Sequence, residues 1–377
     1  MDMKSNRRGF LRNAGIGVAA LAAGTDVLAQ ERKQKGIPRW RGFNLLNFYQ
    51  ALQAGEFSSL AVSEDDFKWI ADWGFDFLRI PMDYWFWIDS DWRVTRRLNP
   101  DDVFKIKESV LEKVDTMIDT AGKYSLHVSL NFHRAPGYCI NDPKREPFVL
   151  WQDKAAQDAF NFHWDLFAKR YKGVSPKKLS FNLLNEAPSP REGYMSREDY
   201  ITIMSKAASI IRSYSPDRPV IVDGLSVGND VIPELIPLNL IQSVHSYIPS
   251  LISHYRASWV DKGTFPTPSW PTAPDAQGRI WDRARLEEHY KQWGELAAKG
   301  VGVHCGEGGC WNRTPYPVFL AWFKDVMDIL KGYGIGYALW QFRGGFGILD
   351  SGRDDVKYED WYGNKLDRTL LSMLQKY

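Results

Sequence analysis

The chain has 377 residues, a formal net charge of +2 and an aromatic content of 14%, including 16 tryptophans. A net charge this close to zero gives no excess of basic residues to bind phosphate groups. It therefore argues against a protein that binds nucleic acid through electrostatic attraction. The aromatic content exceeds what a core alone requires. Flat aromatic faces suit the apolar faces of sugar rings, although burial in the core is the commoner outcome for any one tryptophan.

The first 29 residues carry the features of an export signal. The sequence NRRGFLR at residues 6–12 precedes a small apolar run at residues 14–23, and small residues end the segment near Ala29. The apolar run is much shorter than the ~20 residues of a membrane-spanning helix, so a cleaved twin-arginine signal is favoured over a membrane anchor. We therefore expect a secreted or periplasmic mature protein, residues 30–377, with no net charge and no membrane attachment.

The rest of the chain alternates short apolar segments with amphipathic ones. Eight strands are predicted, at residues 42–46, 75–80, 127–132, 179–184, 220–222, 240–245, 300–305 and 335–340. Helical spacing predicts helices at residues 64–73, 102–124, 153–171, 197–214, 229–235, 283–298, 318–332 and 367–375. Strands that alternate with helices indicate a parallel sheet. Eight strands without a glycine-rich phosphate-binding turn favour an α/β fold of the (β/α)8 TIM-barrel type, in a single domain, over a doubly wound sheet.

The longest connection, residues 246–281, follows the predicted sixth strand and is rich in proline, serine and aromatic residues. It carries Trp259, Trp270 and Trp281. Long connections at the carboxyl face of a barrel often carry function. We therefore expect it to form one wall of a substrate cleft, with a solvated insertion as the alternative.

Polar residues end most of the predicted strands. They are Arg79 in the second strand, His133 after the third, Asn185 and Glu186 after the fourth, His245 and Tyr247 at the sixth, Glu307 after the seventh and Trp340 at the eighth. The carboxyl ends of barrel strands meet at one mouth, so Glu186 and Glu307 would face each other across it. Retaining glycosidases need carboxyl groups ~5 to 5.5 Å apart, and inverting ones ~6.5 to 9.5 Å. Either glutamate alone would more often be a helix N-terminal charge or an ion-pair partner.

These strand ends resemble the motifs of glycoside hydrolase family 5, the cellulase family. The similar segments are LLNEAP at 183–188, GEGG at 306–309, FLRIP at 77–81, His133, HSY at 245–247 and Trp340. The resemblance runs from Arg41 to about Asp350 and implies a double displacement, with Glu307 as nucleophile and Glu186 as acid/base. In that scheme Arg79 and Tyr247 would hold Glu307 ionised and fix its orientation.

The resemblance also implies roles for residues around the reacting bond. Asn185 would contact the sugar 2-hydroxyl, and Trp340 would lie under the reacting sugar. His133 and His245 would position hydroxyl groups of the sugar or adjust the protonation of the carboxyl groups. The implied partner is an oligo- or polysaccharide, most simply β-1,4-glucan, acted on by a monomer. Related β-mannan, xylan, β-1,3-glucan or exo-type substrates remain alternatives, because loops change specificity without changing the fold.

Further residues beyond the strand ends could form sugar subsites. The candidates for substrate binding are Asn44, Trp85, Trp311 and Arg343, besides Trp340. Core or loop packing is the alternative for each aromatic residue. A catalytically silent carbohydrate-binding barrel would share the aromatic residues, but it would lose a carboxylate or its supporting arginine.

Metal binding is the main rival for a barrel mouth that contains histidines. His133, His245 and His304 lie at or near predicted strands, but no His-x-His pair or loop of alternating aspartates occurs. The three cysteines, Cys139, Cys305 and Cys310, lack metal-ligand spacing and allow one disulfide at most. We therefore expect no metal and no cofactor.

Overall fold

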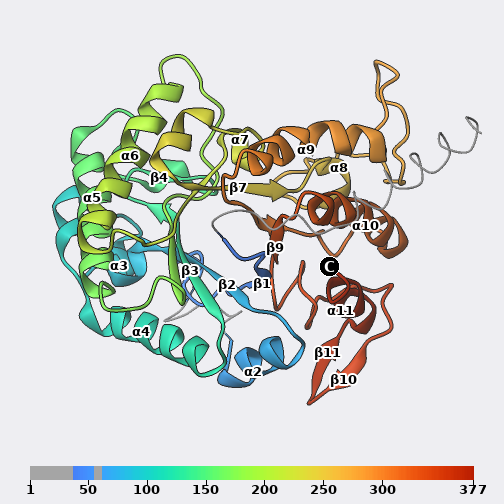
Figure 1. The fold of residues 1–377 in the computed structure, drawn as a ribbon, viewed down its shortest axis with the longest axis horizontal. Coiled ribbons are helices and arrows are strands. Elements are labelled where there is room, and N and C mark those ends of the chain that lie inside the picture. The colour runs from blue at the N-terminus through green and yellow to red at the C-terminus, as the bar shows by residue number, and fades with distance from the viewer. Residues whose placement is uncertain (1–36, 55–61) are drawn as a thin grey trace, which may run out of the picture.

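The computed structural model describes residues 37–54 and 62–377 (Figure 1). The predicted export signal, residues 1–29, lies outside the described residues. No helix in the described part of the chain is long and apolar enough to cross a membrane.

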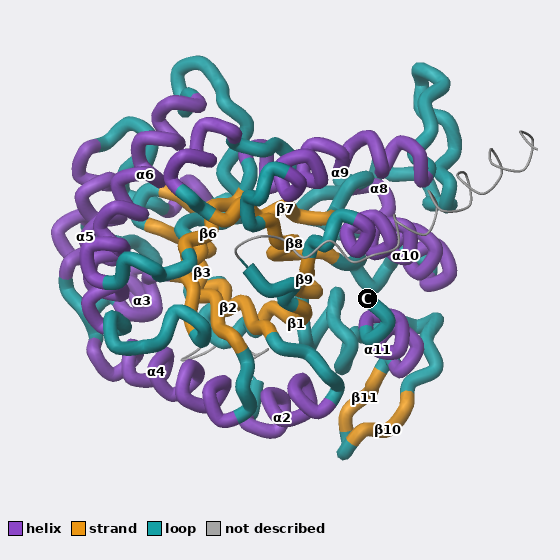
Figure 2. The backbone as a smooth tube through the Cα atoms, viewed as in Figure 1, coloured by secondary structure: helices purple, strands orange, loops and turns teal. Residues whose placement is uncertain are grey.

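Eight parallel strands form a closed barrel (Figure 2). They are β1 (Arg41–Asn44), β2 (Phe77–Asp83), β3 (His127–Ala135), β5 (Leu179–Asn182), β6 (Val220–Asp223), β7 (Ile241–Ser246), β8 (Val303–Gly308) and β9 (Gly336–Leu339). Each strand pairs with its neighbour, and β9 pairs back onto β1, with Gly42 opposite Ala338. The predicted single-domain (β/α)8 barrel is therefore confirmed.

Helices surround the barrel, as Figure 2 shows. The long ones are α2 (Glu64–Asp72), α4 (Glu108–Lys123), α5 (Lys154–Arg170), α6 (Arg197–Tyr214), α9 (Arg283–Ala298), α10 (Tyr316–Gly332) and α11 (Arg368–Leu374). Short helices are α3 (Trp92–Thr95), α7 (Leu225–Gly228) and α8 (Ser250–Ser253), and the 3-10 turns are η2 (Tyr84–Trp87), η3 (Pro100–Phe104), η4 (Pro143–Arg145) and η5 (Pro233–Leu238). The bounds of α6 and α9 agree with the prediction residue for residue.

Two predicted helices differ from the structure. The segment 102–124 is divided into η3 and α4, because Ile106 forms an antiparallel bridge with Ile88 and so leaves the helical path. The predicted helix 229–235 is wrong. Its place holds the 3-10 turn η5, in which Pro233 and Pro237 lack the N–H groups that a regular helix uses.

Three short strands were not predicted. The strand β4 (Tyr138–Cys139) pairs antiparallel with the end of β3, next to the mouth. The hairpin of β10 (Glu359–Trp361) and β11 (Asn364–Leu366) lies outside the barrel beside α11 (Figure 1). All three cysteines are buried and free, so no disulfide joins them.

An aromatic plug closes the amino end of the barrel, opposite the mouth. Trp40 stacks on His127 with ring centroids 4.1 Å apart and on Phe77 at 5.2 Å. His304 packs against Phe77 at 4.5 Å, and burial lowers its pKa to about 3. His304 is thus a neutral core residue, and polar side chains from the strands are left to fill the other end.

Candidate active site

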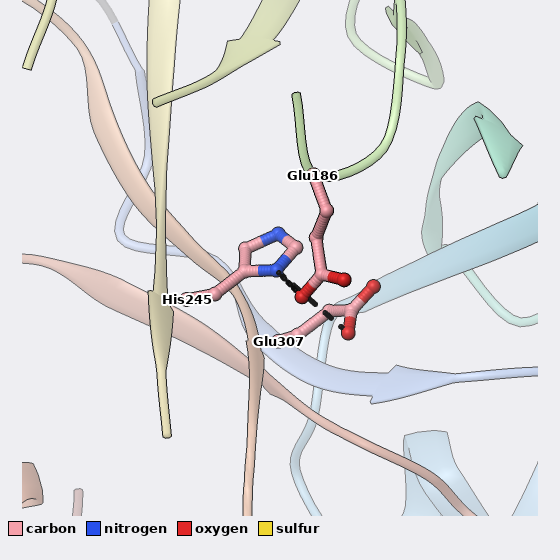
Figure 3. Close-up of side chains that lie close together, drawn as sticks. All are labelled: Glu186, His245 and Glu307. Atoms are coloured by element: carbon pink, nitrogen blue, oxygen red, sulfur yellow. Dashed lines mark hydrogen bonds and ion pairs between the residues drawn. The ribbon is translucent and has the colours of Figure 1, made fainter. Parts of the chain in front are cut away.

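The polar strand ends meet at the carboxyl mouth of the barrel. The structure brings together the residues predicted to be catalytic, and Figure 3 shows three of them, Glu186, His245 and Glu307, pointing toward one another. Arg79 comes from β2, Glu307 from β8 and His245 from β7, while Glu186 follows β5. Residues separated by up to 228 positions in the chain therefore share one site.

Glu307 is buried, with 3% of its surface exposed. Arg79 Nη1 donates a hydrogen bond to its Oε1 at 2.5 Å, and the hydroxyl of Tyr247 donates to its Oε2 at 3.1 Å. Burial raises the pKa of Glu307, and the charges of His245 and Arg79 oppose that rise. Both oxygens are held in place, which fixes the direction from which this carboxylate could attack.

Glu186 lies in a different setting. Its side chain is 18% exposed, and its backbone adopts a left-handed conformation with φ of 49°. Its Oε1 lies 3.0 Å from His245 Nδ1, while its backbone carbonyl accepts a hydrogen bond from the Tyr138 hydroxyl at 2.6 Å. Glu186 is therefore the more accessible of the two carboxyl groups to a ligand or to water.

The two carboxyl groups are close. One carboxylate oxygen of Glu186, one of Glu307 and a ring nitrogen of His245 all lie within 4.8 Å of one another. A retaining glycosidase needs carboxyl groups ~5 to 5.5 Å apart, whereas an inverting one needs ~6.5 to 9.5 Å to admit a water molecule. The nearest carboxylate oxygens of Glu186 and Glu307 thus lie closer together than the separation of an inverting pair.

Arg79 organises the floor of the mouth. It is 1% exposed and donates to three side-chain amides besides Glu307: Asn182 at 2.9 Å, Asn44 at 3.0 Å and Asn185 at 2.8 Å. A guanidinium carries five donors in one plane, so it can hold several acceptors in fixed positions. Asn185 keeps its Nδ2 without a protein partner.

Asn44 was expected to bind substrate, and its side chain is engaged by the protein. It is fully buried, and its Nδ2 donates to the carbonyls of Gly306 and Leu339. Asn44 therefore ties β1 to the ends of β8 and β9 beneath the carboxylates. Both polar atoms of the Asn44 side chain have protein partners, so the expectation that it contacts substrate is not supported.

Asp223, at the end of β6, is a residue that sequence reasoning missed. It is fully buried, and its Oδ2 lies 3.1 Å from His245 Nε2 and accepts the backbone N–H of Glu186 at 3.0 Å. Burial works against its charge, but His245 and Arg79 hold the pKa of Asp223 below its ordinary value. The sequence did contain the feature that identified the other site residues, because Asp223 is a polar residue directly after the predicted strand 220–222.

His245 has a carboxylate oxygen beside each ring nitrogen. Burial works against its charged form, yet Asp223, Glu307 and Glu186 raise the pKa of His245 to about 10. These carboxylates favour the charged imidazolium form of the ring. In that form both ring nitrogens carry protons, so the ring offers no lone pair to a metal ion.

Aromatic residues line one side of the carboxylates. Trp340 stacks on His133, with ring centroids 5.4 Å apart and planes 22° apart. Tyr49 meets both rings edge-on, at 4.8 and 5.3 Å. His133 Nε2 lies 3.3 Å from Asn141 Nδ2, and burial lowers the pKa of His133 well below its usual range. The neutral ring of His133 thus packs against one face of the Trp340 indole.

A second aromatic group lies where the connections after β7, β8 and β9 meet. Trp259 and Trp311 pack at 4.9 Å with planes 81° apart, and Phe346 lies 5.5 Å from Trp311. Trp259 is 51% exposed, so a face is available to a ligand. In the same connection Trp270 instead donates to Asp325 of α10 at 2.9 Å. Only the first part of residues 246–281 thus joins this aromatic group.

Trp85 was expected to be a sugar platform, but it is fully buried. It packs against Trp92 and under the guanidinium of Arg134. Arg134 in turn pairs with Asp83 Oδ2 at 3.2 Å and Glu146 Oε1 at 2.7 Å. We call Asp83, Arg134 and Glu146 the flank cluster, and Trp85 belongs to its packing.

Arg343 was also expected to bind substrate, and its guanidinium is committed elsewhere. It donates to Asp66 in α2 at 2.6 and 3.0 Å, and to Asp350 and Asn364 at 2.8 Å each. Arg343 therefore joins α2 to the C-terminal hairpin. The expectation that it contacts substrate is not supported.

Comparisons with known proteins agree with this geometry. A model of the family described as cellulase (glycosyl hydrolase family 5) matches residues 31–345. Endoglucanase C of Acetivibrio thermocellus is 25% identical over 346 residues, covering 84% of this chain and 95% of that protein. Cellodextrinase A of Ruminococcus flavefaciens is 25% identical over 285 residues, covering 73% and 76%. A solved structure of a glycoside hydrolase is 40% identical with a TM-score of 0.81, covering 90% of this chain and 99% of the other.

Proposed function

The chain belongs to glycosyl hydrolase family 5, the cellulase family, and from this premise we propose that it hydrolyses β-1,4-linked glucans with retention of configuration. The observation that carries the proposal is the spacing of Glu186 and Glu307, whose nearest carboxylate oxygens fall within 4.8 Å. The substrate class is supported by the relatives, which are an endoglucanase and a cellodextrinase.

The reaction takes two displacements. In the first, a Glu307 oxygen attacks the anomeric carbon while the bond to the leaving oxygen breaks, and Glu186 gives its proton to that oxygen. In the second, Glu186 takes a proton from water, the water oxygen attacks the anomeric carbon, and Glu307 leaves as a carboxylate. The exposure of Glu186 and the fixed position of Glu307 suit these two roles.

The surrounding residues support the same chemistry. Arg79 and Tyr247 stabilise the negative charge that returns to Glu307 when the intermediate breaks down. Asn185 has its oxygen tied to Arg79 and its Nδ2 free, so it can donate to the sugar 2-hydroxyl. Trp340, backed by His133, provides the platform under the reacting sugar.

Two matched variants test the roles of the carboxylates. With 2,4-dinitrophenyl β-cellobioside, which needs little protonation, Glu307→Ala should lose activity, and azide should restore it as the α-glycosyl azide. Glu186→Ala should still form the glycosyl-enzyme, and azide should trap it as the β-glycosyl azide. Opposite anomers follow because azide replaces the nucleophile in one variant and water in the other. Full activity of Glu307→Ala, or the same anomer from both variants, would contradict the proposal.

A substrate panel tests the linkage. We expect the wild-type protein to release cello-oligosaccharides from β-1,4-glucan faster than it acts on β-mannan, xylan or β-1,3-glucan. Product sizes over time separate internal cleavage from release at chain ends. Faster turnover of another glycan would replace the substrate while leaving the carboxylate roles intact.

We also propose that residues 1–29 are removed on export and that residues 30–377 form a monomeric catalytic domain outside the cytoplasm. The motif NRRGFLR and the short apolar run after it support this. Replacing Arg7 and Arg8 with lysine should block export. The N-terminal sequence and native mass of the exported protein test the cleavage position and the monomer.

A further inference from the structure

Asp223 is the carboxylate that links the acid/base to the cationic floor of the mouth. Its Oδ1 accepts from Asn182 at 3.0 Å, while its Oδ2 faces His245 at 3.1 Å and Arg79 Nη2 at 3.6 Å. The same Oδ2 accepts the backbone N–H of Glu186 at 3.0 Å. Its full burial beneath these partners keeps it away from substrate. It therefore acts on the reaction only through its neighbours.

The balance of charges shows what Asp223 does. We call Arg79, Glu186, Asp223, His245 and Glu307 the central cluster. It has two cationic groups and three carboxyl groups, so it is neutral when one carboxyl group is protonated. An excess negative charge is costly in a buried site, so the neutral state is favoured. Glu186 is the most exposed of the three carboxyl groups, and the acid role proposed above assigns the proton to it.

The backbone of Glu186 needs support as well. A left-handed conformation costs ~1 to 2 kcal/mol for a residue with a side chain. The hydrogen bond from the Glu186 N–H to Asp223 holds this conformation, and the hydroxyl of Tyr200 in turn holds Asp223 by donating to its carbonyl at 2.7 Å. One carboxylate thus fixes both the backbone of Glu186 and the imidazole that contacts its side chain.

We infer that Asp223 is a positioning residue that keeps a proton on Glu186 and a second proton on His245, by balancing the positive charges of the central cluster. The inference rests on the acid role proposed above for Glu186. The other titratable groups that act on the cluster are three histidines, four tyrosines and one thiol: His133, His254, His304, Tyr49, Tyr138, Tyr200, Tyr247 and Cys305. Burial lowers the pKa of these histidines and raises that of the tyrosines and the thiol, so none of the eight supplies a negative charge at neutral pH and none can replace Asp223.

The kinetic test is the variant Asp223→Asn in the mature enzyme. It keeps the shape of the side chain but removes one negative charge, so the cluster should lose a proton at lower pH. For phenyl β-cellobioside, which needs protonation, the basic limb of kcat/KM should move down by at least ~1 pH unit. 2,4-Dinitrophenyl β-cellobioside needs little protonation of its leaving group. For this substrate, the fold-decrease in kcat/KM that Asp223→Asn causes at pH 8 should be at least ~10-fold smaller than for phenyl β-cellobioside.

Asp83→Asn is the matched control. Asp83 also ends a barrel strand, is 2% exposed, accepts the backbone N–H groups of Ala51 and Trp85, and faces an arginine. It contacts neither Glu186 nor His245. Its replacement should therefore lower stability without moving the basic limb.

A spectroscopic test reads the proton directly and does not depend on turnover. The chain has seven histidines. Burial lowers the pKa of six of them: His127, His133, His163, His254, His289 and His304. At pH 8, nitrogen NMR of 15N-histidine-labelled protein should show one imidazolium, absent from His245→Gln. On raising the pH, this imidazolium should lose its proton at a lower pH in Asp223→Asn than in wild type, and at the wild-type pH in Asp83→Asn.

The two tests separate this inference from the proposed function. An unmoved basic limb together with an unchanged imidazolium signal in folded Asp223→Asn would overturn the inference. If Asp223→Asn does not fold, Asp223→Glu retains the charge and should keep the imidazolium, and loss of the signal there would contradict the charge argument. If wild-type protein hydrolysed neither aryl cellobioside, the proposed function would fail, and the NMR result would still decide the state of His245.

Discussion

The central cluster and the flank cluster are both buried ion networks at the barrel mouth, but they differ in the groups that their carboxylates contact. In the flank cluster, the carboxylates of Asp83 and Glu146 face Arg134 and also accept backbone N–H groups from loops. In the central cluster, a histidine with a raised pKa lies among the carboxylates. We infer that the flank cluster fixes loop positions and that the central cluster fixes protons.

The largest expected effect comes from breaking the central cluster at Arg79. Arg79→Met leaves Glu307 and Asp223 buried without their guanidinium. We expect kcat/KM to fall by ~10³-fold or more, and the free energy of unfolding to fall by about 3 to 5 kcal/mol. Steady-state kinetics and urea unfolding measure the two effects. A variant with nearly full activity would show that the arginine is structural only.

The corresponding variant of the flank cluster is Arg134→Met. Arg134 is 4% exposed and also faces two carboxylates, so the loss of stability should again be about 3 kcal/mol. Activity measured below the melting temperature should fall by less than ~10-fold, with the same pH profile. A shift of the pH profile would mean that the flank cluster is not separate from the chemistry.

A smaller effect should appear in the pH dependence of stability. The pKa of His245 is raised from 6.5 to about 10, so its stabilising contribution is complete below pH 6.5 and is lost as the pH rises toward 10. Between pH 7 and 8.5, the wild-type protein should lose up to about 1.4 kcal/mol per pH unit relative to His245→Gln. His289, whose pKa is lowered, gives the control: wild type and His289→Gln should have equal slopes.

The smallest expected effect concerns neither cluster. Trp259→Ala removes a half-exposed ring beside Trp311. Loss of one stacking face should raise KM for cello-oligosaccharides by about 3- to 10-fold, with kcat nearly unchanged. Trp270→Ala, from the same connection but anchored to α10, is the control for folding of the loop. An equal rise in KM for both variants would point to loop collapse and not to a lost contact.

The fold and the meeting of Glu186 with Glu307 at the mouth could be predicted because both depend on local patterns. Apolar runs give the strands, and a parallel barrel brings every strand end to one mouth, so Glu186 and Glu307 had to meet. Side-chain direction could not be read in the same way. Trp85 follows a strand end, but it lies in the 3-10 turn η2, all four residues of which are buried.

Local sequence patterns also could not predict contacts between residues that are far apart in the chain. Arg343 was a reasonable candidate by position, yet Asp66 lies 277 residues away and takes its guanidinium. Asp223 ends a strand like the other site residues, but its importance comes from His245 and Glu186 lying on either side of it. Pairing between distant polar groups decides these roles, and a single sequence does not record it.

The left-handed backbone of Glu186 has a consequence for how this site persists through evolution. Glycine adopts a φ of 49° without the cost that glutamate carries there. Glu186→Gly is one base change away in the glutamate codons and would relieve this cost, whereas it would also remove the contact of Glu186 with His245. In the proposed mechanism, selection for turnover is what keeps a glutamate at that position.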